Sequence, residues 1–226
     1  MNKSTKIRLE GLRVLEPITK NQERAFKAYT EGMHLSLNGS AGTGKTFIAM
    51  GLALEDVLDK ETQYNKLVIF RSVVPTRDIG FLPGTEDEKK EVYTAPYRGI
   101  ISELFNESDA WDALVNQGAI DFLTTSYIRG TTISDAIILV DEMQNLNFHE
   151  LDSVITRIGD NCKLIMCGDY YQSDFAKDKD RNGILKFMEI IDRMKYFETI
   201  EFTWEDIVRS DLVREYIMTK EHLGIK

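Results

Sequence analysis

The sequence contains few cysteines and prolines and no long apolar stretch. Its 2 cysteines, Cys162 and Cys167, have a C-x-x-x-x-C spacing that fits neither a zinc knuckle nor a redox pair. The longest unbroken apolar run, Ala136–Val140, is far shorter than the roughly 20 residues that cross a bilayer as a helix. The first residues alternate charged and apolar side chains and show no secretory signal. These absences favour a cytoplasmic protein with reduced cysteines and no membrane span.

Basic charge is also scarce. Among 226 residues, Lys and Arg total 28 while Asp and Glu total 37, which gives a net charge of −9. Binding duplex DNA through overall charge requires a basic face, so this balance counts against such binding but leaves room for a local basic groove. The histidines, His34, His149 and His222, are scattered and do not indicate a metal site.

Short apolar segments alternate with segments of helical periodicity. Apolar segments without polar alternation predict strands buried on both faces. The expected strands are 33–37, 67–70, 120–123, 136–140, 163–167 and 200–202. The expected helices are 21–31, 45–58, 109–116, 148–158, 185–194 and 206–218, and 87–105 is expected to be helical but interrupted before Pro96. The alternation predicts an α/β fold with a mainly parallel sheet covered by helices on both faces, in one domain over 1–226 with an insertion-rich excursion over 72–129.

The sharpest motif has the pattern G-x-x-x-x-G-K-[ST]. It consists of Gly39, Ser40, Ala41, Gly42, Thr43, Gly44, Lys45 and Thr46. An expected strand precedes it and an expected helix follows it, which is the context that a phosphate-binding P-loop requires. Its backbone N–H groups and the helix N-terminus form a site for phosphate oxygens. Lys45 is expected to reach the β- and γ-phosphates and Thr46 to place its hydroxyl on Mg²⁺, so the expected ligands are ATP and Mg²⁺.

Two later strands are followed by polar residues. The strand that ends at Val140 is followed by Asp141 and Glu142, and the strand that ends at Cys167 is followed by G-D-x-x-Q, which ends at Gln172. Ligands of open α/β sheets bind at the carboxyl ends of the strands. We expect Asp141 to hold Mg²⁺ and Glu142, turned away from Asp141 by strand alternation, to polarise the attacking water. Gln172 is expected to contact the γ-phosphate or that water.

An amide at the start of the first expected helix indicates base recognition. Gln22 could read the adenine edge through its paired donor and acceptor. Guanine recognition usually requires N-K-x-D after a strand. Asn65 and Lys66 precede their strand and are not followed by the Asp. The sequence therefore favours adenine.

These motifs, in their order along the chain, resemble the PhoH family of phosphate-starvation-type P-loop ATPases. The resemblance covers about residues 18–216. It rests on Gln22, the P-loop, Phe81-Leu-Pro-Gly84, Tyr127-Ile-Arg-Gly-Thr-Thr132, Asp141-Glu142-Met-Gln144-Asn145, Gly168-Asp169-x-x-Gln172 and Asp206-Ile-Val-Arg209-Ser-x-Leu-Val213, and G-D-x-x-Q also resembles motif III of superfamily-one helicases. The chain departs from the family at Met143, where Ala is frequent, and around Arg77, where the Arg-Pro-containing loop matches loosely.

The resemblance implies a helicase-like ATPase core with an added-strand sheet and ring-like homo-oligomers such as hexamers. Some members also carry an RNA-cleaving PIN domain or a KH-like RNA-binding segment. This chain looks like the short, stand-alone form that bacteriophages often encode, and we expect it to hold neither. Arg209 matches the family's late V-R motif and is the first candidate to offset charge on the γ-phosphate, with Arg129 as the second.

Three functions compete at this point. An ATPase that remodels or moves on single-stranded RNA or DNA is favoured by Gln22 and G-D-x-x-Q. Because the chain has one motor-like domain, an oligomer would complete it, with each arginine facing a neighbour's nucleotide. A nucleotide-dependent regulatory or assembly ATPase is favoured by the acidic charge. A small-molecule kinase is disfavoured because the segment 81–97 is acidic rather than rich in arginine.

Overall fold

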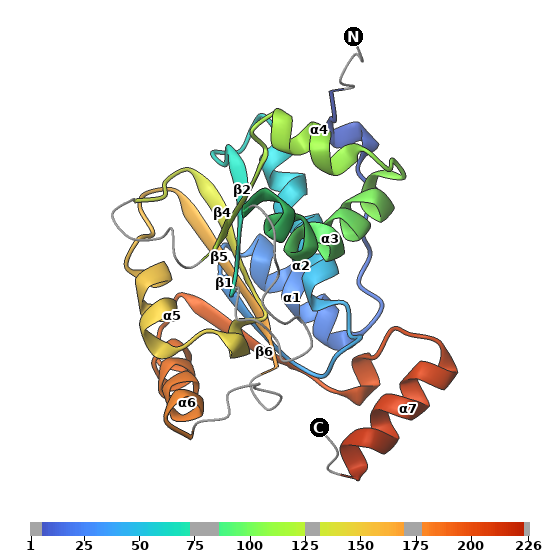
Figure 1. Ribbon diagram of the computed structural model, residues 1–226, viewed down its shortest axis with the longest axis vertical. Helices are drawn as coiled ribbons and strands as arrows, with labels where there is room; N and C mark the ends of the chain where they lie inside the picture. The colour runs from blue at the N-terminus through green and yellow to red at the C-terminus, as the bar shows by residue number, and fades with distance from the viewer. Residues whose placement is uncertain (1–5, 73–85, 125–131, 170–177, 224–226) are drawn as a thin grey trace.

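The computed structural model describes residues 6–72, 86–124, 132–169 and 178–223 (Figure 1). Within these ranges, a 6-stranded sheet has the order β3-β2-β4-β5-β1-β6, and every pair of neighbouring strands is parallel. The strands are β1 (His34–Gly39), β2 (Lys66–Arg71), β3 (Ile120–Thr124), β4 (Ala136–Asp141), β5 (Cys162–Gly168) and β6 (Phe197–Phe202). The predicted parallel α/β fold is confirmed, and β5 lies between β1 and β4.

Helices cover both faces of the sheet. They are α1 (Lys20–Thr30), α2 (Lys45–Leu58), α3 (Glu86–Phe105), α4 (Ala110–Asn116), α5 (Phe148–Ile155), α6 (Asp178–Asp192) and α7 (Asp211–His222). Figure 1 shows α1 to α4 on one face, α5 and α6 on the other, and α7 standing out from the body. Strand β4 contributes to both apolar cores, with Ile137 and Leu139 in one and Ile138 and Val140 in the other. Burial on both faces explains why this strand lacks polar alternation.

The prediction that the helix breaks before Pro96 was wrong, because α3 continues through this residue. An interior proline costs a helix about 3 kcal/mol or more. Here Tyr97 and Ile101 are fully buried just beyond it, and Tyr97 stacks on Trp111 with ring centroids 6.4 Å apart. We attribute the continuity of α3 to this packing, which local propensity does not include.

The last helix begins later than expected. The short 3-10 helix Trp204–Asp206 precedes α7, and the Asp206 carboxylate accepts a hydrogen bond from Thr203 N at 2.9 Å. This capping box turns the chain and separates the segment from α7. Among the described residues, no helix is both long enough and apolar enough to span a membrane.

Candidate functional site

The phosphate-loop motif connects β1 to α2 and rests against the end of β6. Gly39 closes β1 with φ +120°, and a Cβ there would lie 1.9 Å from the carbonyl oxygen of Phe202. Ser40 N donates to that same oxygen at 3.3 Å. Only glycine permits this close approach of two backbones. The first glycine of the motif thus anchors the loop on the neighbouring strand.

The lysine of the motif lies inside its own loop. Lys45 Nζ donates to the carbonyl oxygens of Gly39 and Ser40, both at 2.7 Å, and to Thr43 Oγ1 at 3.1 Å. Burial lowers the pKa of the Lys45 ammonium, and neighbouring acidic groups offset part of that shift. The ammonium therefore lies within the loop, bonded to its carbonyl and hydroxyl oxygens.

The end of β4 meets the start of α2. Thr46 Oγ1 donates to Asp141 Oδ1 at 2.8 Å, and Tyr97 on α3 donates its hydroxyl hydrogen to Asp141 Oδ2 at 2.9 Å. Asp141 is only 5% exposed. Burial, reinforced by the charge of Glu142, raises the pKa of Asp141. The hydrogen bonds from Thr46 and Tyr97 and the nearby Arg71 charge oppose this rise.

These oxygen donors suit Mg²⁺. The ion prefers hard oxygen ligands and usually combines one or two carboxylates with substrate phosphates. The part of the chain that the structure describes contains no group of three or more His, Cys, Asp or Glu that could hold a metal. The hydroxyl of Thr46 and the carboxylate of Asp141 are oxygen groups of the kind that fit a Mg²⁺ ion.

Glu142 lies in a turn beyond the strand. Because β4 ends at Asp141 and Glu142 has a left-handed backbone with φ 52°, this turn sets its direction, and strand alternation does not. Gln144 Nε2 donates to Glu142 Oε2 at 2.5 Å, and Gln144 Oε1 accepts from Asp169 N at 3.0 Å. Gln144 therefore links the end of β4 to the end of β5. The sequence motif that contains Gln144 predicts no role for this residue.

Gly168 makes room for this link. A Cβ at Gly168 would lie 2.6 Å from both Gln144 Oε1 and Met143 Cγ. Met143 is fully buried in the core beneath α5 and α6. The residue that departs from the family pattern thus fits because its neighbour on β5 has no side chain.

Gln22 joins the N-terminal segment to the phosphate loop. It is 2% exposed, its Nε2 donates to the carbonyl oxygen of Thr43 at 3.2 Å, and its Oε1 accepts from Ile18 N at 3.0 Å. A primary amide has two N–H donors and an oxygen with two lone pairs. Within the described residues, these two bonds use one of the donors and one of the lone pairs of the amide.

Arg209 lies over the loop of its own chain. Its Cγ is 3.0 Å from the point where a Cβ of Gly42 would stand, and Val208 N donates to the carbonyl oxygen of Gly42 at 3.0 Å. Arg129, Gln172 and Arg77, and the motifs 81–84 and 127–131, lie outside the described residues.

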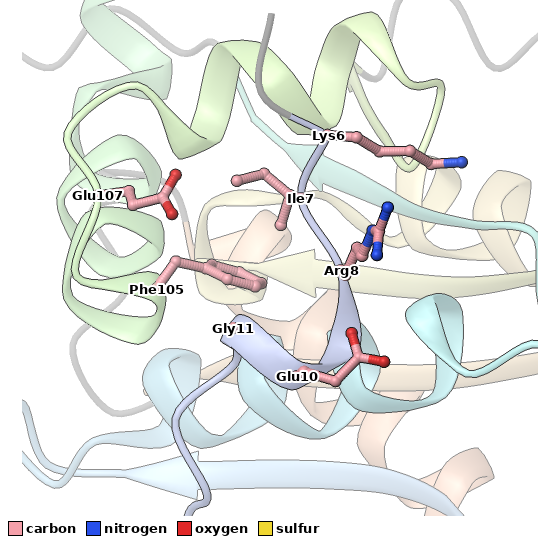
Figure 2. Close-up of a pocket in the computed structure, with 7 residues that line it drawn as sticks. All are labelled: Lys6, Ile7, Arg8, Glu10, Gly11, Phe105 and Glu107. Atoms are coloured by element: carbon pink, nitrogen blue, oxygen red, sulfur yellow. The ribbon is translucent and has the colours of Figure 1, made fainter.

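The structure also contains a hollow of about 400 Å³ at the N-terminal segment (Figure 2). Ile7 anchors this segment, because its backbone N–H and carbonyl bond the Gln117 amide at 2.6 and 3.2 Å. Phe105 lines the hollow at the end of α3, and its rim carries Lys6, Arg8, Glu10 and Glu107. None of the lining residues belongs to the phosphate loop or to the carboxyl ends of the strands.

Comparison with known proteins places this geometry in a family. A PhoH-like protein of Mycobacterium tuberculosis (strain ATCC 25618 / H37Rv) is 31% identical over 206 residues, which cover 91% of this chain and 57% of that protein. Protein PhoH2 of Bacillus subtilis (strain 168) is 38% identical over 162 residues, which cover 69% of this chain and 36% of that protein. The chain therefore spans less than two thirds of the length of these relatives.

A solved structure shows the same type of fold. The large terminase from a thermophilic bacteriophage aligns with a TM-score of 0.50 at 14% identity, over 89% of this chain and 50% of the terminase chain. Identity this low supports similarity of fold alone. The family model described as PhoH-like protein matches residues 14–220. With this match spanning the phosphate loop and both carboxylates, the chain belongs to the family of PhoH-like proteins.

Proposed function

We propose that this chain binds ATP with Mg²⁺, hydrolyses it, and couples hydrolysis to remodelling of, or movement on, single-stranded RNA or DNA as a homo-oligomer. The observation that carries the ATPase proposal is the 2.8 Å hydrogen bond between Thr46 and Asp141, residues 95 positions apart. It joins the hydroxyl of the phosphate loop to a buried carboxylate. In P-loop enzymes this pair of groups holds the metal ion.

Lys45 and the loop amides would bind the β- and γ-phosphates. Lys45 would exchange its bonds to the carbonyl oxygens of Gly39 and Ser40 for bonds to phosphate oxygens. The N-terminus of α2 adds the positive end of a helix dipole. Thr46 and Asp141 would hold Mg²⁺, which, when bound, offsets charge on the phosphates. Gln22 would read the adenine edge with its remaining donor and acceptor.

Glu142 would act on the attacking water. Gln144 holds Oε2 of this carboxylate, and we propose that Oε1 accepts a hydrogen bond from the water. Asp169 N holds Gln144 in turn, so the turns after β4 and β5 position the base together. Gln172 lies outside the described residues, and we propose that it contacts the γ-phosphate or that water, because its G-D-x-x-Q motif follows β5 in the sequence.

Arg209 is expected to support hydrolysis more than ATP binding. Its guanidinium would offset charge that develops on the γ-phosphate, so Arg209→Ala should lower kcat by about 10-fold, the low end for a hydrogen bond to a charged group. Steady-state kinetics and nucleotide titration measure the two effects, with Arg13→Ala, an exposed arginine of the N-terminal segment, as the control. Equal losses in kcat and in affinity would contradict this role.

Mixing variants shows which subunit uses the arginine. Because Arg209 lies against Gly42 of its own chain, we expect no recovery when Arg209→Ala subunits are mixed with Lys45→Ala subunits. Recovery of turnover in the mixture would show that the arginine acts across a subunit interface.

The C-terminal helix supports the oligomer. None of the residues of α7 is buried; Leu212 and Tyr216, four residues apart on it, are 78% and 67% exposed, and Leu223 directly after the helix is 63% exposed. A helix of this length is marginal in water unless packing stabilises it. Light scattering should therefore give a mass above 25.9 kDa, and a 25.9 kDa monomer with and without ATP and Mg²⁺ would contradict this part of the proposal.

Nucleic-acid coupling is tested by ATP turnover with and without single-stranded RNA or DNA, on a sample of known oligomeric state. We expect single-stranded RNA or DNA to raise the rate of ATP turnover. Duplex DNA should have little effect on this rate, because a protein with a net charge of −9 lacks the overall basic charge that duplex binding requires. Lys45→Ala protein controls for contaminating ATPases. An unchanged rate would favour the second candidate, a regulatory or assembly ATPase, which the same acidic charge supports.

A further inference from the structure

Tyr97 lies outside every motif that predicted the nucleotide site, yet it contacts the carboxylate at the centre of that site. It belongs to α3, is fully buried, and donates its hydroxyl hydrogen to Asp141 Oδ2 at 2.9 Å. Thr46 donates to the other oxygen, Oδ1, at 2.8 Å. Both oxygens of the carboxylate are thus held, one from α2 and one from α3.

The Tyr97 ring is itself held on several sides. Its centroid lies 6.4 Å from that of Trp111 on α4 and 5.8 Å from that of Phe122 on β3. The guanidinium carbon of Arg71 lies 5.9 Å from the ring centroid, and Arg71 is the register partner of Asp141 on the neighbouring strand. The hydroxyl therefore approaches Asp141 from a direction set by packing.

A carboxylate buried to this degree needs hydrogen-bond donors, and their directions decide how its plane is turned. With Oδ2 bonded to Tyr97, Oδ1 is directed at the Thr46 hydroxyl, where the proposed Mg²⁺ would bind. Removing the Tyr97 hydroxyl would take away the hydrogen bond from α3 that opposes rotation of the carboxylate about its Cβ–Cγ bond. Metal ligands depend on such outer partners for their orientation.

We propose that Tyr97 is a positioning residue for the Mg²⁺-binding carboxylate and that it ties α3 to the metal site. This inference rests on the proposed function. The excursion over 72–129, which contributes α3, α4 and β3, would then support the site as well as the sheet. Movement of α3 would change how well Asp141 holds the ion.

The test replaces Tyr97 by Phe, which removes the hydroxyl and keeps the ring. Affinity for a non-hydrolysable ATP analogue is measured with Mg²⁺ and again with EDTA, and the ratio gives the strengthening due to the ion. We expect Tyr97→Phe to reduce this strengthening by about 10-fold, the low end for loss of an outer partner of a metal ligand. Affinity in EDTA should stay unchanged.

Two comparisons separate positioning from a structural role. Tyr93→Phe removes a hydroxyl from a half-buried residue one turn earlier on α3 and should leave the ratio unchanged. In an Asp141→Asn background, Tyr97→Phe should cause no further reduction, because it acts through Asp141. If the reductions that Tyr97→Phe and Asp141→Asn cause in the Mg²⁺ strengthening add up in the double variant, the proposal is overturned. The proposal is also overturned if Tyr97→Phe lowers the melting temperature in EDTA but leaves the ratio of analogue affinities with Mg²⁺ and with EDTA unchanged.

The same titrations distinguish a failure of the role of Tyr97 from a failure of the proposed function. If Mg²⁺ strengthens analogue binding equally in wild type and in Tyr97→Phe, the role of Tyr97 is wrong while the proposed function stands. If Mg²⁺ strengthens nothing in the wild-type protein, the metal assignment of Thr46 and Asp141 falls and takes the role of Tyr97 with it.

Discussion

Replacing Glu142 by Gln should leave ATP and Mg²⁺ bound and lower kcat by at least about 10²-fold, the low end for a general base. Gln has nearly the same size, and its amide oxygen can still accept the hydrogen bond that Gln144 donates to Glu142 Oε2. What it loses is the basic carboxylate that polarises the attacking water. Nucleotide affinity should change by less than about 1 kcal/mol, because the change affects the transition state rather than binding.

Single-turnover kinetics and a nucleotide titration measure these two quantities on the same sample. Asp141→Asn is the informative comparison, because it should weaken Mg²⁺ binding itself. Glu61→Gln, on an exposed residue after α2, controls for the loss of one negative charge. If Glu142→Gln hydrolyses ATP at nearly the wild-type rate, the base lies elsewhere. Asp169, at the end of the neighbouring strand β5, would then be the next candidate.

Lys45→Ala should abolish tight ATP binding. A hydrogen bond to a charged group contributes about 1.5–3 kcal/mol, and Lys45 is expected to bond to two phosphates, so affinity should fall by about 10²-fold or more. The loop also loses the donor that bridges the carbonyl oxygens of Gly39 and Ser40. Isothermal titration calorimetry with ATP and Mg²⁺ measures the loss.

The exposed Lys60, just beyond α2, supplies the matched control. Lys60→Ala removes the same charge from the protein and should leave affinity unchanged. Because burial lowers the pKa of Lys45, the fold itself disfavours that charge, and Lys45→Ala should keep its cooperative thermal transition. Unchanged affinity in Lys45→Ala would refute the assignment of the phosphate loop.

Much of the fold could be predicted because it follows from local pattern. The predicted helix over 45–58 has the bounds of α2, since glycine before it and apolar periodicity along it are local signals. Unbroken apolar segments predicted β4 and β5 as strands buried on both faces, and helices between strands predicted the parallel sheet. The phosphate-loop motif needs only its own glycines and the flanking strand and helix.

The contacts between distant segments were decided by tertiary structure. The strand order puts β5 between β1 and β4, which brings Asp169 N to Gln144. Packing carries α3 through Pro96 and directs the Tyr97 hydroxyl to Asp141, a residue 44 positions away. Residue types and spacing along the sequence therefore determined which residues form the candidate site and which chemistry they predict. Only the packed sheet and helices decided which donors hold each carboxylate, because those donors come from elements with no fixed spacing in the chain.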